Sequence, residues 1–107
     1  MAKVSKKKPV FSLRLKEARR AAGLTQEGLG ELAGIDVAVA RTRINRYELG
    51  LHAPDEDTAR RLARALGVPM ASLYADSPAM ARLIQAASQL SDAELIKLAE
   101  GIERKKK

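Results

Sequence analysis

Apolar residues recur at every third or fourth position along most of the chain, and no segment alternates with the period of two that is typical of strands. Ser, Thr or Asp precedes most of these stretches and Gly follows several, as expected for helix starts and ends. The pattern therefore predicts an all-α protein. The expected helices run from Ser12 to Gly23, Thr25 to Gly34, Asp36 to Gly50, Asp55 to Gly67, Pro69 to Tyr74, Ser77 to Leu90 and Ser91 to Ile102.

The second and third predicted helices have the composition of two helices that cross steeply and touch. Gly28 and Gly30 lie inside the second helix, where each costs up to ~1 kcal/mol relative to Ala, so another backbone is expected to pack closely there. Gly34 suits the turn because it can adopt a positive φ. The inward stripe of the third helix is expected to be Val37, Ala40, Ile44 and Tyr47. Its outward donors are expected to be Arg41, Thr42, Arg43, Asn45 and Arg46. These are the features of a helix-turn-helix.

The chain resembles the Cro/phage-repressor (Xre-type) helix-turn-helix family in three segments that occur in the family's order. They are GLTQ at Gly23–Gln26, INRYELG at Ile44–Gly50 and ARRLARALGVP at Ala59–Pro69. The resemblance covers Ser12 to Tyr74, and it rests on the joint order because each segment alone is a weak signal. It implies a five-helix bundle over residues 11–75, a third helix that enters the major groove of duplex DNA, and a homodimer.

The resemblance also implies roles for individual side chains. Arg41, Thr42 and Arg46 match base-reading positions, and Arg43 and Asn45 match positions on bases or neighbouring phosphates. Gln26 matches a phosphate-contacting position. Arg19 and Glu48 match a pair in which the arginine lies between a phosphate and the glutamate. An arginine on the third helix could bind guanine O6 and N7 through two hydrogen bonds, worth ~1–3 kcal/mol of discrimination.

The chain departs from the family between Gly34 and Ile44. Nine residues separate these two positions, where the family pattern has five. The four extra residues either lengthen the turn or extend the third helix by about one turn. Helical geometry favours the longer helix, because four residues rotate the helix face by only ~40°. In that case residues 37–39 would reach deepest into the groove.

The net charge of +7 is concentrated at the N-terminal end. Residues 1–24 hold eight basic side chains and one acidic one, whereas the remainder is close to neutral. This asymmetry favours a polyanionic partner. We expect residues 1–10 to form a flexible basic arm, in which Lys6, Lys7 and Lys8 resemble the phage-repressor arm that wraps around DNA. A solvated tail without a partner is the alternative.

Residues 76–107 lie beyond the resembling segment and are expected to form two amphipathic helices. Their apolar stripes are Leu83, Ile84, Ala87 and Leu90, then Leu95, Leu98 and Ile102. These stripes either pack back on the bundle or form a hairpin that joins two copies. We favour the homodimer, because half-sites one DNA turn apart require a fixed twofold axis.

Several classes of function find no support in the composition. The chain has no Cys and one histidine, His52, so it lacks the usual material for a metal or nucleophilic site, and no metal or cofactor is expected. Asp55, Glu56 and Asp57 complement the dipole of a first helical turn. No apolar run approaches a membrane span or a secretory signal. The residues therefore predict no enzyme and a cytoplasmic location in a bacterium or phage-infected cell.

The prediction is a sequence-specific double-stranded DNA-binding transcriptional regulator, expected to be a repressor. The alternative is an antitoxin-like module, or another protein-interaction module of unknown partner, that acts through the C-terminal helices. A peripheral membrane protein is disfavoured, because no apolar anchor stands beside the N-terminal lysines.

Overall fold

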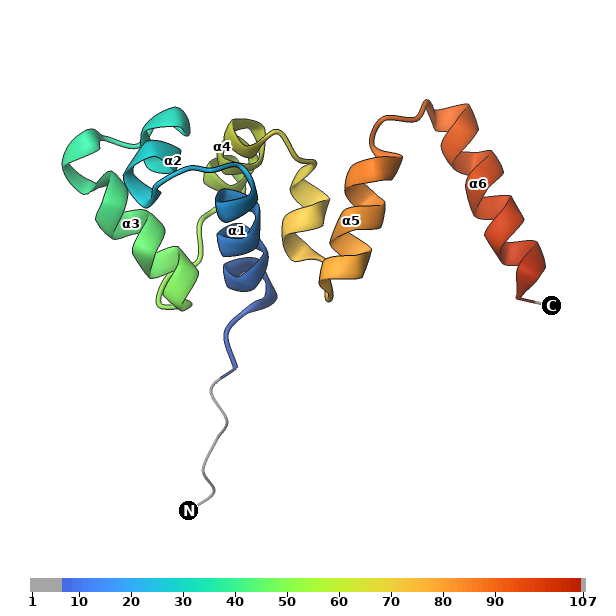
Figure 1. Ribbon diagram of the computed structural model, residues 1–107, viewed down its shortest axis with the longest axis horizontal. Coiled ribbons are helices and arrows are strands. Elements are labelled where there is room, and N and C mark those ends of the chain that lie inside the picture. Colours follow the sequence, from blue (N-terminus) through green and yellow to red (C-terminus); the bar gives the residue numbers. More distant parts are fainter. Residues whose placement is uncertain (1–6, 107) are drawn as a thin grey trace, which may run out of the picture.

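Helices make up most of residues 7–106, the part of the chain that the computed structural model describes, and no strand occurs among them (Figure 1). The all-α prediction is confirmed. The elements are α1 (Val10–Ala21), α2 (Gln26–Leu32), α3 (Val37–Leu49), α4 (Glu56–Leu66), the 3₁₀ helix η1 (Met70–Tyr74), α5 (Pro78–Ala87) and α6 (Asp92–Lys105).

Most helix starts coincide with the cap residues predicted from the sequence. Five helices begin after a residue whose side chain accepts a backbone N–H: Thr25, Asp36, Asp55, Ser77 and Ser91. Ser91 and Glu94 form a capping box at the start of α6. Gly50 and Gly67 end α3 and α4 with φ values of 79° and 71°, a backbone conformation that residues with a Cβ rarely adopt.

The start of α1 differs from the prediction. The helix begins before Ser12, whose hydroxyl is buried and donates to the Tyr47 backbone oxygen at 2.6 Å. This bond ties α1 to the last turn of α3. Leu15 on this helix is fully buried. Leu13, two positions earlier, lies about 200° around the helix from Leu15 and is therefore exposed. Arg14, between them, is buried.

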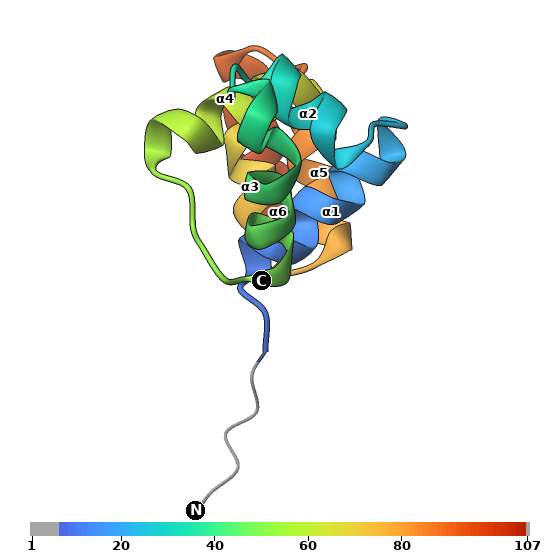
Figure 2. The same ribbon diagram turned by 90° about the vertical axis from the view of Figure 1, so that its left-hand side faces the viewer.

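The core lies where α1, α2, α3, α4 and η1 meet, and it positions α3 at one side of the bundle (Figure 2). Its fully enclosed centre consists of aliphatic side chains: Leu15, Leu29, Ile44 and Leu62. Phe11 and Tyr74 add an aromatic contact between α1 and η1, with ring centroids 5.1 Å apart. Burial of these apolar side chains is the main source of stability in such a bundle.

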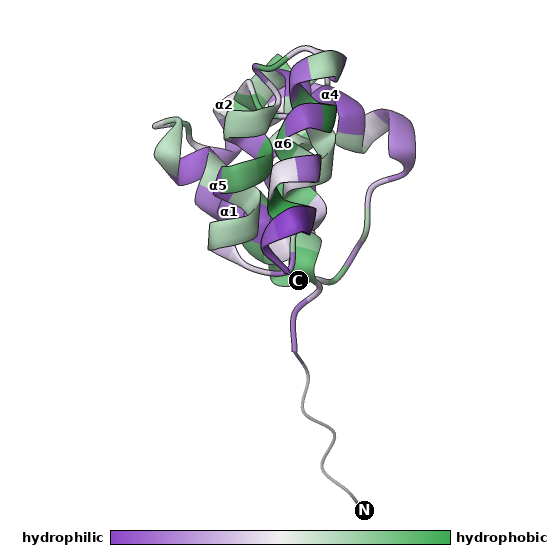
Figure 3. Cartoon of the chain, turned by 90° about the vertical axis from the view of Figure 1, so that its right-hand side faces the viewer, coloured by the Kyte–Doolittle hydropathy of each residue, from purple (hydrophilic) through white to green (hydrophobic). Residues whose placement is uncertain are grey.

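The last two helices extend the molecule away from α3. The segment α5 packs against η1, whereas α6 buries no residue and lies at the opposite end from α3 (Figure 1). The radius of gyration is 16.1 Å, against about 13 Å for a compact domain of this length. Figure 3 views the molecule from the α6 side and shows apolar residues along both helices. Within one chain α5 and α6 therefore do not close into a packed hairpin, and α6 does not enlarge the bundle.

Candidate nucleic-acid interface

The contact between α2 and α3 is as close as the glycine in α2 suggested. A Cβ placed on Gly30 would lie 2.7 Å from the Cβ of Ala40 and 3.2 Å from its backbone oxygen. Gly34, in the turn between the helices, has a φ of 85°. The two small residues let the helix axes approach, and the glycine lets the chain turn sharply. This is the helix-turn-helix arrangement predicted from the sequence.

The extra residues between Gly34 and Ile44 lie in the helix rather than in the turn. The α3 helix begins at Val37, and the side chain of Asp36 caps it by accepting the backbone N–H of Ala38. The prediction of a longer third helix is confirmed. Val37 itself is 60% exposed, so its assignment to the inward stripe was wrong.

The buried face of α3 fixes which side chains point away from the bundle. Ala40, Ile44, Tyr47 and Glu48 are buried. At 100° per residue, Thr42 lies opposite the centre of this buried face, with Asn45 and Arg46 on either side of it. All three side chains are exposed. Two predicted base-reading residues, Arg41 and Arg43, lie nearer the edges of the exposed face.

Arg41 lies on the α2 side of the exposed face. It lines an open hollow of about 520 Å³ together with Arg19, Thr25, Gln26 and Glu27. This hollow sits at the N-terminus of α2. Arg41 is thus grouped with the residues expected to contact phosphates rather than with the outermost residues of α3.

Arg43 lies on the opposite edge, towards the loop that follows α3. Its Nη2 donates to the Tyr47 hydroxyl at 2.7 Å, and its guanidinium carbon lies 5.8 Å from the centre of the same ring. Arg43, Arg46 and His52 line an open cavity of about 440 Å³ beside the first turn of α4. The hydrogen bond holds Arg43 along the helix, so Arg46 has the greater freedom to reach outward.

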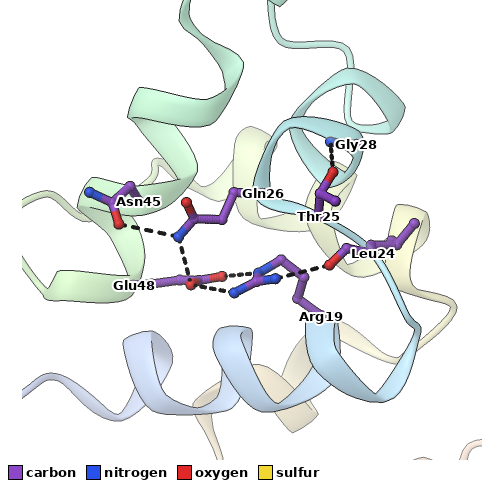
Figure 4. Close-up of polar contacts among 7 residues, drawn as sticks. All are labelled: Arg19, Leu24, Thr25, Gln26, Gly28, Asn45 and Glu48. Carbon is purple, nitrogen blue, oxygen red and sulfur yellow. Dashed lines mark hydrogen bonds and ion pairs between the residues drawn. The ribbon is translucent and has the colours of Figure 1, made fainter.

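A hydrogen-bonded network joins α1, α2 and α3 beneath the exposed face (Figure 4). The Arg19 guanidinium donates to both carboxylate oxygens of Glu48, from Nε at 2.6 Å and from Nη2 at 3.0 Å, and from Nη1 to the Leu24 carbonyl at 2.9 Å. Gln26 Nε2 donates to Glu48 at 3.0 Å and to Asn45 Oδ1 at 3.2 Å. The network fixes the orientation of two predicted DNA-contacting residues, Gln26 and Asn45.

The carboxylate of Glu48 is the centre of this network. Its side chain is 3% exposed and that of Arg19 is 13% exposed, so water competes little for their hydrogen bonds. The hydrogen bond to Glu48 raises the pKa of Arg19 above its ordinary value, against the opposing effect of burial. The pair matches the predicted Arg19–Glu48 pairing, and one predicted phosphate ligand is thereby committed to a bidentate ion pair.

Basic side chains continue from this network along α1. Lys8, Lys16 and Arg20 line an open hollow of about 240 Å³ that Glu48 also borders. Lys7 and Lys8 are exposed just before α1, whereas Lys6 lies outside the described residues. Lys8 of the predicted arm therefore lies on the same side of α1 as Glu48, near the end of α3.

Three apolar side chains lie on the exposed face of α3. Ala38, Val39 and Leu49 lie on the same side as Thr42, and Val39 and Leu49 are 43% and 46% exposed. Ala38 and Val39 belong to residues 37–39, which were expected from the sequence to lie nearest the DNA in a longer helix, whereas Leu49 was missed. The signal for Leu49 was available in the helical phase, since it stands opposite Ala40, Ile44 and Tyr47.

The helix-turn-helix (HTH_3) family model matches residues 15–73, more than half of the chain. The chain belongs to this family. Among solved structures it is similar to the crystal structure of transcriptional regulator BswR, with 41% sequence identity, coverage of 87% of this chain and 92% of that chain, and a TM-score of 0.72. The comparison with curated proteins gives no match.

Family membership and the structural likeness make this chain a DNA-binding transcription regulator and not an enzyme. Within residues 7–106, no helix is long and apolar enough to cross a membrane. No group of His, Cys, Asp and Glu side chains in the same range is arranged to hold a metal ion. The interface described above is thus built from helices and from cationic, amide and apolar side chains.

Proposed function

We propose that this regulator binds specific sequences in duplex DNA by placing α3 in the major groove, and that it represses transcription by occupying its operator. The observation that carries the proposal is the exposed face of α3, where Thr42, Asn45 and Arg46 stand opposite the buried stripe on a helix held rigidly by its neighbours. A bound protein of this size excludes other proteins from the same stretch of DNA. The cytoplasm of a bacterium or phage-infected cell is the compartment in which such an operator is reached.

Base reading is assigned to the middle of the exposed face. Arg46 can donate two hydrogen bonds to guanine O6 and N7, worth about 1–3 kcal/mol of discrimination. Asn45, oriented by Gln26, can bind adenine through its amide. Thr42 presents a methyl group suited to thymine, as do Ala38 and Val39.

Backbone contacts are assigned to the two edges of α3 and to the N-terminal end. Arg41 and Arg43 lie at these edges, and the Arg19–Gln26 network adjoins Arg41. Lys6, Lys7 and Lys8 would add charge along the duplex. Each phosphate that they neutralise should steepen the dependence of log affinity on log salt by about 0.9. Phosphate contacts of this kind set affinity and register, whereas the base contacts set the sequence.

We further propose that the active form is a homodimer joined through α5 and α6. Large apolar side chains are exposed on both helices and in the turn between them: Met80 and Leu83 on α5, Leu90 in the turn, and Ile96, Leu98 and Ile102 on α6. Exposed apolar surface of this extent marks interaction sites in soluble proteins. A second copy is the favoured occupant, because the same face on two chains can meet around a twofold axis. Such an axis would set two α3 helices about one DNA turn apart.

Selection of bound duplexes from a random library, followed by footprinting, tests the DNA proposal. We expect an enriched motif with two related half-sites, and altered preference at one or two positions for Asn45→Ala and Arg46→Gln. Arg104→Gln, on α6, is the matched control and should select the wild-type motif. Selection of no motif, or of the same motif by all variants, would overturn the assignment of α3.

Sedimentation at several concentrations tests the dimer. Leu98→Glu should shift the chain to monomer, whereas Lys97→Glu, a neighbouring exposed substitution on the same helix, should not. A wild-type chain that stays monomeric would contradict the homodimer.

The same exposed apolar faces favour a second candidate function, an antitoxin-like interaction with another protein through α5 and α6. A partner captured by the full chain but lost on truncation at Ser77 would support this function. Capture that persists after truncation would locate the contact on the bundle instead.

A further inference from the structure

Arg14 is a buried cation that the DNA-binding function does not use. The residue is 5% exposed, and its Nε and Nη1 have no hydrogen-bond partner among residues 7–106. Its nearest carboxylate oxygen is Oε1 of Glu17, 3.5 Å from Nε, on a side chain that is half exposed. A guanidinium keeps its charge at all accessible pH values, and this ion pair, which is too long and misaligned for a hydrogen bond, compensates its burial only in part.

The guanidinium lines a cavity where three elements meet. The cavity lies between α1, η1 and α5, is open to solvent on one side and has a volume of about 140 Å³. An engineered cavity of about 150 Å³ in another protein holds benzene, so the space suffices for a molecule of five or six heavy atoms. It is much smaller than the usual pocket for a drug-sized ligand.

Two other polar side chains of the cavity can donate to an anion. Arg82 and Gln85 reach it from α5. The Ser72 hydroxyl also lines the cavity, but it donates its proton to the Pro69 carbonyl at 2.8 Å and is not counted as a donor to the anion. Two guanidinium groups against the single carboxylate of Glu17 leave the site with a net positive charge. Planar guanidinium groups bind carboxylate and phosphate oxygens in pairs.

We propose that this cavity is a binding site for a small oxyanion, phosphate or a short-chain carboxylate, held between Arg14 and Arg82. The bound anion bridges α1 and α5 and thereby fastens the start of the α5–α6 segment to the helix-turn-helix bundle. The site lies on a different set of elements from α2 and α3, so its occupancy is separable from DNA contact.

The full chain is titrated with inorganic phosphate, and in a second arm with propionate, at constant ionic strength balanced by chloride. The readouts are the melting temperature and the NMR signals of the Arg14 Nε–H and the Ala81 amide. We expect a saturable shift of these signals and a rise in melting temperature with at least one of the two anions. Binding should weaken about tenfold or more in Arg82→Gln, which removes one charge-assisted contact at an exposed residue.

Two further variants decide where the anion binds. Arg14→Met should abolish the saturable response, and Arg82→Gln keeps the test valid if Arg14→Met does not fold. Arg46→Gln removes a cation from α3 and should leave the response of the cavity signals unchanged. A response unaffected by Arg82→Gln, or no saturable response to either anion, would overturn the proposal and leave the cavity to water.

Discussion

The Arg19–Glu48 ion pair should behave as a buried unit whose two halves cannot be removed independently. Loss of one partner of a buried pair costs about 3–5 kcal/mol, because the other charge stays buried without its counter-ion. Gln26 still donates to Glu48 when Arg19 is removed, so we expect Arg19→Met to lower the free energy of unfolding by about 3 kcal/mol, the lower end of that range. This is a large share of the 5–15 kcal/mol that stabilises a typical domain.

A double-mutant cycle measured by urea unfolding tests this expectation. Glu48→Leu alone should cost a similar amount, since it strands Arg19, whereas Arg19→Met/Glu48→Leu together should be more stable than either single variant. The expected coupling is at least about 2 kcal/mol. The exposed pair Arg60–Glu56, with side chains 51% and 75% exposed, is the matched control and should couple by less than about 0.5 kcal/mol.

Additive effects of the two substitutions at Arg19 and Glu48 would refute the reasoning, because they would show that the pair does not compensate its own burial. The folded double variant then separates stability from function. We expect it to bind DNA more weakly than wild type, since Gln26 loses one of the two acceptors that orient it and Arg19 no longer offers a cation beside it.

Three other substitutions probe single features of the fold. Gly30→Ala should lower the free energy of unfolding by about 1–3 kcal/mol, because the added methyl group overpacks against Ala40. The higher helix propensity of Ala offsets up to about 1 kcal/mol of this loss. An unchanged urea midpoint would contradict the close contact. Gly101→Ala, which meets open space, should slow amide exchange within α6 but leave the unfolding midpoint of the bundle unchanged, because α6 buries no residue. Hydrogen bonds from the backbone and side chain of Thr58 lower the pKa of Asp55, so its stabilising effect is present above about pH 4 and is lost as the pH falls through the lowered pKa. Asp55→Asn keeps a capping side chain, so the urea midpoint of this variant should depend less on pH across this acid range than that of the wild type. The same pH dependence in both proteins would show that Asp55 does not contribute to it.

The helices were predictable because their signals are local. A cap side chain bonds to a backbone N–H two or three residues away, so Thr25, Asp55 and Ser91 could be assigned from neighbouring residues alone. The close approach of α2 and α3 was predictable too, since a glycine inside a helix lowers stability unless a neighbouring element needs the space that a Cβ would fill. The neighbour that fills this space is Ala40 of α3.

The features that escaped prediction depend on contacts between distant residues. The burial of Arg14 follows from the packing of α1 against η1 and α5, which no local pattern reveals. The hydroxyl of Ser12 was assigned to a helix start, yet it bonds to Tyr47, 35 residues away. Arg43 likewise bonds to the Tyr47 hydroxyl, whereas the helical phase alone would also allow its side chain to point outward.

The longer α3 shows how an insertion can change the exposed surface of a helix without disturbing the core. Four residues add about 6 Å and one turn, with a rotation of only about 40°, so Ala40, Ile44 and Tyr47 keep one buried face while the added turn projects beyond it. That turn carries Val37 and Val39, both exposed, rather than hydrogen-bond donors. With α3 placed in the major groove as proposed, its first residues would reach base edges, and apolar contact with thymine methyl groups would be the form of discrimination available there. In the same proposal the arginines of α3 would contact DNA further along the helix, beside Asn45, which Gln26 holds in place.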